Sequence, residues 1–574
     1  MTQLVTTVKD RMMFRWSIKF NWASFLLISC MFATGACGLV LEFIQSTVGT
    51  YIFGNSIEQY SITMGLMLFM MGVAAKLQKY FSDRNLIEIF IGIEILLAII
   101  GGYSPIATYW AYGIMEAHVK LVQYFFIMSL GLLIGLEIPV VMRINEKYYK
   151  KLSLNIEKVF SADYIGALLG TFLWVYYLLR RFPLTEISFI LAGVNFGVAV
   201  VTAIYFIHKN MIAKKLTIII LMIFTAISLF IGYNHNRNWN KLLEQHLYDD
   251  PIVFSTTTKY QHLVMTHSRA IDEYRFFINS NLQFCSTDEE RYHEPLVHPV
   301  MNLVSSHKRV LILGGGDGMA LREVLKYPDV EEVLLVDLDP AMTQFCSQNP
   351  ILRKLNQNSF KDARVVTMIG HGITTDGSKP IYMETGIISK DKEKQNKVEK
   401  IADVAILNLD ADKFLSEVRG KWNVIIIDFP DPSGIELAKL YSKEFYLKLR
   451  RILAEHGMIV VQSTSPYYAR ESYLCIMRTM EDAGFNTLPF HENVPSFGDW
   501  GWFIAWKNNF SKNAVVRQIE ELDFNVSTKY LTPDVFRRAL VFGKNELVSK
   551  YNEVNTLMYP ILLHYYLKES WLTD

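Results

Sequence analysis

The sequence predicts a multi-domain fold in which an N-terminal α-helical transmembrane bundle precedes a soluble α/β unit. Three observations predict this class. Apolar stretches of bilayer length recur from residue 24 to 233, short β-type segments follow at 252–284, and apolar strands alternate with helical stretches from 308 to 506. We therefore expect a transmembrane helical domain at 1–240, a small β-strand subdomain at 241–300, an α/β domain at 301–510 and a C-terminal helical tail at 511–574.

The composition agrees with this division and argues against some functions. With 574 residues, of which 51% are hydrophobic, the chain is long enough for several domains and too apolar on average for a purely soluble protein. Its formal net charge of +1 provides no overall basic field for nucleic acid. The five cysteines have neither CxxC nor Cys/His metal spacing, so they predict no zinc site and no disulfide framework. We accordingly expect no metal and no nucleic-acid partner.

Seven apolar stretches are long enough to cross a lipid bilayer. The first is not a cleaved secretory signal, because it lacks a small-residue cleavage pattern and further spans follow it. We therefore expect an integral protein that crosses the plasma (inner) membrane several times. The spans lie near 24–44, 60–77, 86–109, 121–142, 161–180, 184–207 and 215–233.

The orientation of these spans is ambiguous. Lysines and arginines gather in alternate connections, which predicts a cytoplasmic N-terminus. Seven spans that start inside would place everything after residue 233 outside the cytoplasm, and Arg180 and Arg181 lie in a connection that the same rule assigns to the outside. Either one span is miscounted or the soluble half faces away from the cytoplasm, and both alternatives stay open.

The soluble part begins with β-type runs such as PIVFSTTTKYQHLVMTH and YRFFINSNLQF, which predict a small strand-rich subdomain. Beyond it, apolar segments alternate with helical stretches, which argues for a parallel, doubly wound sheet. These segments are KRVLILG (308–314), EEVLLVDLD (331–339), ARVVTMIG (363–370), WNVIIIDFP (422–430), GMIVVQST (457–464) and GWFIAW (501–506).

A glycine-rich turn follows the first of these strands. The sequence GGGDG spans Gly314 to Gly318, a helical stretch comes next, and the second strand ends in Asp337. Such a turn lets the backbone approach a ligand closely, and an acidic residue after the second strand can bind ribose hydroxyls. A tight strand-to-helix turn without a ligand would have the same glycines. Asp317 favours a ligand, because a carboxylate here suits a cation such as a sulfonium nucleoside or an ammonium group.

A second acidic motif, VIIIDFPDPSG, follows a predicted central strand. Asp428 and Asp431 lie just past the carboxyl end of that strand, where open α/β sheets bind ligands. Two such carboxylates can hold an amine and remove its proton before it attacks an electrophilic carbon. The alternative is an ordinary Asp-Pro turn. Together with Asp317, the pair predicts an acidic pocket that favours a polycationic substrate.

In their order, these motifs resemble those of membrane-bound spermidine synthases, the branch of the polyamine aminopropyltransferases that carries an N-terminal multi-span domain. The resemblance extends from about residue 260 to 505 and implies a Rossmann-like, methyltransferase-type fold. Its motifs are Tyr260-Gln261, Gln283, DEERYHEP with Tyr292 and His293, Gly314 to Gly318, Asp337, Asp410-Ala411 and Asp428 to Pro432.

The resemblance implies decarboxylated S-adenosylmethionine as co-substrate, no separate cofactor, and putrescine as the expected acceptor, with spermidine and methylthioadenosine as products. Asp428 would orient and deprotonate the acceptor amine, which Tyr292 and Asp431 would help to seat. Asp337 would hold the ribose and Asp410 the adenine amino group. The donor-binding set implied is Gln261, Gln283, His293, Gly314, Gly316, Asp317, Asp337, Asp410 and Ala411.

Three features depart from the family pattern. Residues 278–280 are Ile-Asn-Ser where the family has Leu-Asp-Gly, and Val494 replaces a tyrosine at the far end of the acceptor pocket. A polar, charge-rich insertion at 372–402 also splits the region before the Asp-Ala pair, so that ARVVTMIGHG and VAILNLDA compete for the same strand. We prefer Asp410 to His371 as the adenine contact.

Carboxylates also occur within or at the ends of the apolar spans, where ionised groups are costly and usually face the bundle interior. One hypothesis is that some of them bind or conduct polyamine cations; the alternative is that they serve helix packing. These residues are Glu42, Glu88, Glu94, Glu137 and Asp163.

Two rival functions remain at this point. A methyltransferase on the same fold would share the glycine loop and Asp337 but would need neither Asp317 nor the Asp428/Asp431 pair. A polyamine sensor or transporter with a non-catalytic synthase-like domain would tolerate loss of Asp428. The expected partners are the polyamine and sulfonium nucleoside substrates, the lipid bilayer and further copies of the chain in a homo-oligomer.

Overall fold

The computed structural model describes residues 21–53, 56–115, 118–148, 151–369, 403–507 and 511–569. The chain forms two compact units that divide between Asp249 and Asp250. The predicted insertion at 372–402 and His371 lie outside the described residues.

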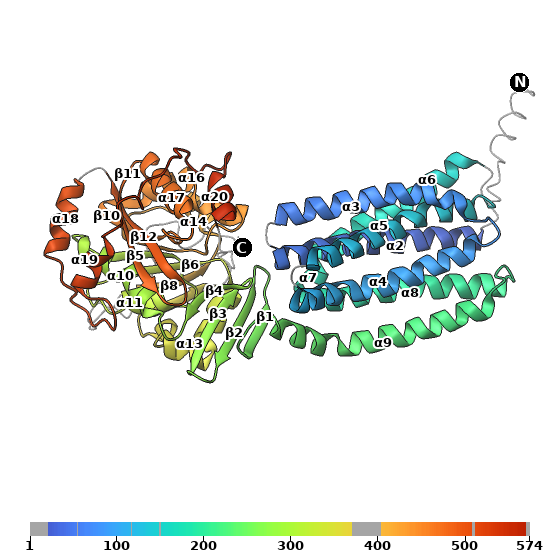
Figure 1. Ribbon diagram of the computed structural model, residues 1–574, viewed down its shortest axis with the longest axis horizontal. Helices are drawn as coiled ribbons and strands as arrows, with labels where there is room; N and C mark the ends of the chain where they lie inside the picture. The colour runs from blue at the N-terminus through green and yellow to red at the C-terminus, as the bar shows by residue number, and fades with distance from the viewer. Residues whose placement is uncertain are drawn as a thin grey trace, which may run out of the picture. The chain divides into compact units, whose positions relative to one another are not determined.

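The first unit is helical, and within its described residues seven helical segments are long and apolar enough to cross a membrane, by length and composition (Figure 1). Six of the seven predicted spans fall within one of these segments, and the span predicted at 161–180 runs two residues past the segment that ends at Leu178. The last helix, Lys215–Gln245, extends well past the predicted end of the span at residue 233. The prediction ended where the apolar residues end, but the polar residues that follow remain helical. The helices are α2 (Trp22–Phe53), α3 (Ser56–Leu77), α4 (Leu86–Ile114), α5 (Val119–Asn145), α6 (Leu152–Leu173), α8 (Leu184–His208) and α9 (Lys215–Gln245), with a π-helical turn (Trp174–Leu178) and the short α7 (Leu179–Arg181) between α6 and α8.

Small residues let these helices approach closely. Gly166 and Gly170 of α6 face the backbone of α2: a Cβ on Gly166 would lie 2.0 Å from the carbonyl oxygen of Phe32, and one on Gly170 would lie 2.6 Å from that of Ala36. A Gly-x-x-x-Gly spacing places both glycines on one helix face, a device that apolar bundles use where backbones touch. The contact between α2 and α6 therefore depends on these two positions.

The carboxylates of this unit lie in different environments. Glu94 and Glu137 are fully buried, at 0% and 2% exposure. Glu88 instead accepts hydrogen bonds from the backbone N–H groups of Ala213 and Lys214, at 2.7 and 2.9 Å, and so ties the start of α4 to the connection before α9. The remaining two members of the predicted set, Glu42 and Asp163, are half-buried.

The second unit starts with a four-stranded antiparallel sheet in the order β1-β2-β3-β4. Asn279 and Ser280 form the two-residue turn between β3 and β4 with φ of +49° and +66°. Left-handed conformation at both central residues is the requirement of a type I′ hairpin, so the departure from the family's Leu-Asp-Gly still closes the turn. The strands are β1 (Ile252–Thr257), β2 (His262–Ser268), β3 (Glu273–Ile278) and β4 (Asn281–Cys285).

An eight-stranded sheet in the order β11-β12-β10-β9-β5-β6-β8-β7 forms the centre of this unit. The strands from β10 to β7 are parallel, as predicted, whereas β12 pairs antiparallel with both β10 and β11. The strands are β5 (Arg309–Gly314), β6 (Glu332–Asp337), β7 (Val365–Ile369), β8 (Asp403–Asn408), β9 (Trp422–Asp428), β10 (Leu453–Gln462), β11 (Phe485–Val494) and β12 (Gly498–Lys507).

One sequence-based expectation about this sheet is wrong, and one of its strands was not anticipated. The segments expected to compete for one strand are both strands, and β7 and β8 are parallel neighbours. The segment at 485–494 was not predicted as a strand, yet it pairs with β12 along its whole length, from Phe485 to Val494. Its internal proline and polar residues obscure the strand pattern, and its position at the sheet edge tolerates them.

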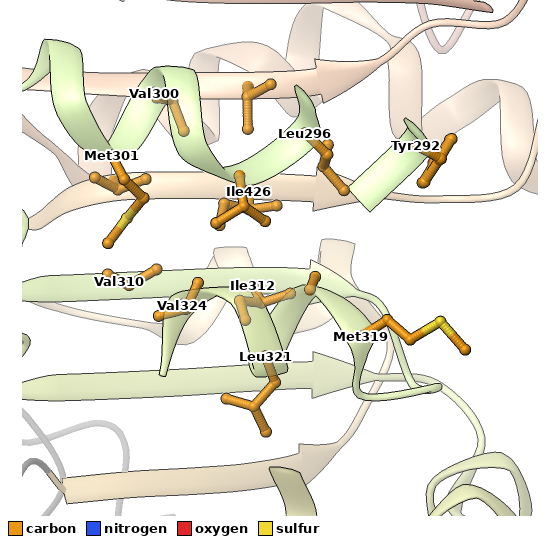
Figure 2. Packing of buried hydrophobic residues seen from close by; sticks show 14 of the residues in the cluster. Tyr292, Leu296, Val300, Met301, Val310, Ile312, Met319, Leu321, Val324 and Ile426 are labelled. Carbon is orange, nitrogen blue, oxygen red and sulfur yellow. The ribbon is translucent and has the colours of Figure 1, made fainter. Parts of the chain in front are cut away.

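Helices cover both faces of the sheet, which is why its strands are almost continuously apolar. Along β5, Val310 and Ile312 belong to one buried cluster, and Leu311 and Leu313 belong to the other. Figure 2 shows the first face, where residues of α10 lie over Ile426 and β5. The helices are α10 (Glu290–Leu303), α11 (Met319–Val324), α12 (Pro340–Gln348), α13 (Pro350–Leu355), α14 (Ala411–Glu417), α15 (Ile435–Ala438), α16 (Lys443–Ile452), α17 (Arg470–Asp482), α18 (Lys512–Glu520), α19 (Pro533–Ala539) and α20 (Ile561–Glu569).

The strand order places a topological switch point between β5 and β9. Strands β6, β8 and β7 lie on one side of β5, and β9, which follows them in the chain, lies on the other side. In open α/β sheets, ligands bind in the crevice at the carboxyl ends of the strands that flank such a point. Gly314 and Asp428, which end β5 and β9, are register partners there.

Candidate active site

The glycine turn after β5 is closely packed against the end of β9. Gly314 has a φ of +84°, and a Cβ at this position would lie 2.0 Å from the carbonyl oxygen of Asp428. Gly315 and Gly318 also have positive φ, at +65° and +81°. No side chain fits at Gly314, because both its conformation and the neighbouring backbone exclude one.

Asp337, at the end of β6, is held beside this turn by backbone groups. Its carboxylate accepts the N–H of Gly316 at 3.1 Å and the N–H of Asp339 at 2.9 Å. A Cβ on Gly316 would lie 2.5 Å from Asp337 Oδ2. Desolvation raises the pKa of Asp337 to about 7, and the charges of Asp339 and Asp317 act in the same direction. The carboxyl is therefore pre-oriented at the position where this class of sheet binds a ribose.

The Asp410-Ala411 pair follows β8, the strand next to β6. Asp410 caps α14 by accepting the N–H of Lys413 at 3.0 Å, and its other oxygen lies 3.1 Å from the ammonium of Lys439. Although desolvation raises the pKa of Asp410, these hydrogen bonds and the lysine charge lower it below its usual value. Asp410 is thus an ionised acceptor at the same sheet edge as Asp337.

A compact cluster of His293, Asp317 and Asp428 lies at the switch point, with ligand atoms of all three within 4.8 Å of one another. Asp317 Oδ1 accepts the N–H of Met319 at 2.7 Å, and Oδ2 lies 4.0 Å from His293 Nε2. The Tyr292 hydroxyl donates to Asp428 Oδ1 at 2.6 Å. Two carboxylates and one imidazole thus converge on one small volume, from the turn after β5, the end of β9 and α10.

The ionisation of Asp428 reflects its surroundings. Desolvation raises its pKa to about 6, with a further contribution from the charge of Asp317, while His293 and the hydrogen bond from Tyr292 oppose the shift. A carboxyl with a pKa near 6 is mostly ionised at neutral pH and is a better proton acceptor than an ordinary aspartate.

His293 is held as a cation by residues that the sequence interpretation did not identify. Its Nδ1 lies 2.9 Å from Glu289 Oε2, and both oxygens of Glu289 accept hydrogen bonds from Arg322, at 2.6 and 2.9 Å. Although burial lowers the pKa of His293, the hydrogen bond that it donates to Glu289 and the charge of Asp317 raise it to about 9. A protonated imidazole donates from both of its nitrogens. The sequence feature that could have identified Glu289 as a partner of His293 is the spacing of four residues, which places the two side chains on one helix face.

Asp431 lies in a second, adjoining set of hydrogen bonds. Its Oδ2 accepts the hydroxyls of Tyr566 and Thr464, at 3.0 and 3.2 Å, and its Oδ1 lies 3.4 Å from the amide nitrogen of Gln462. Desolvation raises the pKa of Asp431 to about 6 against the lowering effect of these three donors. None of the three partners was predicted, because they come from β10, the segment after it and the distant helix α20.

The two predicted glutamines lie in different places. Gln261 follows a turn whose Thr258 hydroxyl donates to Asp339 at 2.7 Å, which ties that turn to the end of β6. The side-chain amide of Gln283 donates to carbonyls of its own hairpin, those of Asn281 at 3.1 Å and Leu282 at 3.4 Å. Among the hydrogen bonds between described residues, none joins Gln283 to the three clustered side chains. The turn before Gln261 is therefore anchored beside the end of β6.

Aromatic residues form the wall beside Tyr292. Its ring centroid lies 5.6 Å from that of Trp502 and 6.0 Å from that of Phe497. Val494, where the family has a tyrosine, is fully buried at the end of β11. The Ser496 backbone N–H and hydroxyl both donate to Asp288, at 2.7 and 3.0 Å, and so hold the β11–β12 turn against the start of α10. This turn thus places Phe497 beside the ring of Tyr292.

Comparison with known proteins gives one family model and several full-length relatives. The model, described as the spermine/spermidine synthase domain, matches residues 289–375 and 388–517. A polyamine aminopropyltransferase 2 of Ralstonia nicotianae is 34% identical over 555 residues, covering 96% of this chain and 99% of that protein. A polyamine aminopropyltransferase of Leptospira interrogans is 36% identical over 85% of this chain and 90% of its own length. Polyamine aminopropyltransferase 1 of Streptomyces coelicolor is 36% identical over 96% and 95%.

Proposed function

Because the chain belongs to the polyamine aminopropyltransferase family, we propose that it transfers the aminopropyl group of decarboxylated S-adenosylmethionine to an amine, with putrescine as the expected acceptor. The products are then spermidine and methylthioadenosine. The observation that carries this proposal is the convergence of Asp317, Asp428 and protonated His293 at the switch point, beside Asp431. The pocket contains three carboxyl groups and one cationic side chain, His293, and is therefore negative overall when the carboxyl groups are ionised. Such a pocket suits substrates that carry only positive charge.

The donor fits the edge formed by β5, β6 and β8. Asp337 accepts the ribose hydroxyls, the Asp410-Ala411 segment receives the adenine, and the side-chain-free turn at Gly314 admits the nucleoside close to the backbone. Asp317 faces the ammonium of the aminopropyl arm. Ordinary S-adenosylmethionine has a carboxylate beside that amine, and Asp317 would repel it, so the pocket selects the decarboxylated form. No further cofactor enters this proposal.

The transfer is a displacement at carbon. The acceptor nitrogen attacks the methylene next to the sulfonium, the new C–N bond forms as the C–S bond breaks, and the bonding electrons return to sulfur as a neutral thioether. Asp428 takes the proton that the acceptor nitrogen must lose, and the hydroxyl of Tyr292 holds its carboxylate in place. Much of the acceleration comes from holding nitrogen and carbon in line.

The direct test incubates the detergent-solubilised protein with decarboxylated S-adenosylmethionine and a panel of amines and follows methylthioadenosine. Release that requires both an amine and Asp428, judged against Asp428→Asn, supports aminopropyl transfer and identifies the acceptor. Donor binding without release for any amine would refute it and favour the sensor or transporter alternative.

For the first unit, we propose that the seven helices cross the plasma (inner) membrane, which their length and apolar composition allow. Resistance to alkaline carbonate extraction from that membrane fraction is the expected result, and release into the soluble fraction would contradict it. We also propose a homo-oligomer, which light scattering of the detergent-solubilised protein measures directly. A monomeric mass would refute that assembly.

A second candidate function of the first unit is polyamine binding or transport, and its buried carboxyls favour it. Glu94 and Glu137 interact electrostatically, and within the described part of the chain neither oxygen of Glu94 has a hydrogen-bond partner. A polyamine would supply both donors and positive charge at such a place. In proteoliposomes, a lower flux of labelled putrescine for Glu137→Gln at unchanged aminopropyl transfer would support this function, and an unchanged flux would refute it.

A further inference from the structure

Tyr566, near the end of the chain, contacts a residue of the proposed acceptor site. Its hydroxyl donates to Asp431 Oδ2 at 3.0 Å although the two residues are 135 positions apart. Tyr566 lies on α20, beyond residue 517, where the match to the spermine/spermidine synthase domain ends. The contact is therefore supplied by a segment that the shared catalytic domain does not include.

Independent contacts anchor α20, so the position of Tyr566 does not depend on its own hydrogen bond. The neighbouring Tyr565 hydroxyl donates to Glu553 at 2.8 Å, and Glu569 accepts the backbone N–H of Glu471 at 2.8 Å. Both Tyr565 and Tyr566 are buried, at 5% and 8% exposure. The two tyrosines thus share their side-chain chemistry, their helix and their burial, but the Tyr566 hydroxyl donates to Asp431 whereas the Tyr565 hydroxyl donates to Glu553.

The two carboxylate oxygens of Asp431 differ in the hydrogen bonds that they accept. Oδ2 accepts two hydroxyls, from Tyr566 and Thr464, which uses both of its lone pairs. Among the described residues, the one hydrogen bond to Oδ1 is the long contact of 3.4 Å from Gln462. An ammonium group that approaches this carboxylate therefore finds its free acceptor capacity on Oδ1.

The strained backbone conformation of Thr464 is a second observation that favours a function for the hydrogen bonds around Asp431. Thr464 has a φ of +60°, a conformation that a β-branched residue adopts at a cost of roughly 1–3 kcal/mol. The strain is maintained by neighbouring contacts, since the Thr464 N–H donates to Gln462 Oε1 at 3.1 Å and its carbonyl accepts the N–H of Gly501 at 2.8 Å. The strained conformation aims the threonine hydroxyl at Asp431.

We propose that Tyr566 is a positioning residue for the acceptor, which orients the Asp431 carboxylate so that Oδ1 receives the ammonium of the amine end that does not react. This inference rests on the proposed aminopropyl transfer and extends it to the C-terminal helix. It predicts a specific effect on the acceptor and none on the donor, because the donor-binding groups on β5, β6 and β8 do not contact Tyr566 in the described structure.

The effect of removing the Tyr566 hydroxyl on the acceptor KM should depend on pH, and the direction of this dependence can be predicted. Asp431 binds an ammonium only when ionised, and the hydrogen bond from Tyr566 lowers its pKa, which desolvation has raised to about 6. The other ionisable groups that interact with Asp431 are the phenols of Tyr292 and Tyr441, from α10 and from the turn before α16. They stay neutral across the range from pH 5 to 8. Asp428, whose pKa is also about 6, titrates over the same range, so the change in acceptor KM reflects both carboxyls, and its displacement between the wild type and Tyr566→Phe reports Asp431. Removal of the Tyr566 hydroxyl shifts this change to higher pH.

The test compares Tyr566→Phe with the matched control Tyr565→Phe in the full-length, detergent-solubilised enzyme. We expect Tyr566→Phe to raise the KM for putrescine roughly tenfold at pH 7, with kcat and the donor KM unchanged and the pH dependence of the acceptor KM displaced upward. Tyr565→Phe should keep the wild-type KM values, because the Glu569 contact and the buried ring at position 565 still hold α20 in place. In an Asp431→Asn background, Tyr566→Phe should add no further effect, because its partner is already neutral.

Three results would overturn the inference. Identical kinetics for the two phenylalanine variants would show that the Tyr566 hydroxyl has no role, and an additive effect in the Asp431→Asn background would show that it does not act through Asp431. A lower melting temperature with both KM values raised in parallel would make Tyr566 a structural residue only. Failure of the proposed function is distinguishable from all of these, because then the wild-type enzyme itself would release no methylthioadenosine with any amine.

Discussion

Replacement of Glu289 by glutamine should strongly destabilise the α/β unit and weaken the charge on His293. The Glu289 side chain is 1% exposed and accepts three strong hydrogen bonds, two from Arg322 and one from His293. A glutamine at this position would present N–H donors to groups that are themselves donors, and it would leave the Arg322 guanidinium, 3% exposed, with Glu323 as its remaining carboxylate.

The structure indicates the size of this effect. Although burial raises the pKa of Glu289, its hydrogen bonds to His293 and Arg322 lower it from 4.5 to about 2, a difference that corresponds to roughly 3 kcal/mol of favourable interaction. Breaking a buried ion pair by removing one partner typically costs about 3–5 kcal/mol. Because the folded-state pKa is depressed, this stability is present above the unfolded pKa of the carboxyl and is lost as the pH falls toward 2.

Glu290, the next residue, provides the control. It pairs with Lys529, whose side chain is 60% exposed, and such surface pairs contribute at most about 1 kcal/mol. Urea unfolding of the full-length protein in detergent, followed by intrinsic tryptophan fluorescence, should show a loss of about 3 kcal/mol or more for Glu289→Gln. Equal stability of Glu289→Gln and Glu290→Gln would refute the argument that the buried network holds the site together.

Four further predictions concern activity. Asp428→Asn should lower kcat roughly a hundredfold to ten-thousandfold at unchanged donor affinity in calorimetry, and retained turnover would remove Asp428 as the base. Gly316→Ala should weaken donor binding about tenfold or more, because its methyl group would lie 2.5 Å from Asp337 Oδ2; unaltered binding would place the donor elsewhere. The kcat/KM for the amine should rise with pH through about 6, as Asp428 and Asp431 lose protons, and a flat profile from pH 5 to 8 would contradict this. Glu137→Gln should leave aminopropyl transfer unchanged, which the methylthioadenosine assay measures.

Much of the candidate site was visible in the sequence because its residues follow strand ends. Asp337 and Asp428 come directly after apolar runs, and the carboxyl ends of parallel strands meet at one edge of a sheet. The glycine turn could be predicted in the same way, since backbone that must reach positive φ and pack against a neighbouring strand leaves few residue choices. These features depend on short stretches of chain, and their arrangement follows from the general geometry of α/β sheets.

The partners of these residues could not be predicted in this way. Tyr566 reaches Asp431 across 135 positions, and Arg322 reaches Glu289 across 33, so no local period or spacing connects them. The β11 strand was missed for a related reason: its pattern is irregular, and it is a strand because β12 offers it a complete set of hydrogen-bond partners.

The sequence by itself determined the helical first unit, the alternation of strands and helices in the second, and the acidic residues placed at strand ends, because hydrophobic periodicity and turn chemistry act over a few residues. The tertiary structure alone decided the order of the strands, the protonated state of His293 and the three donors around Asp431. These depend on which distant side chains are brought together and desolvated, and the free energy of such contacts is not a property of any one segment of the chain.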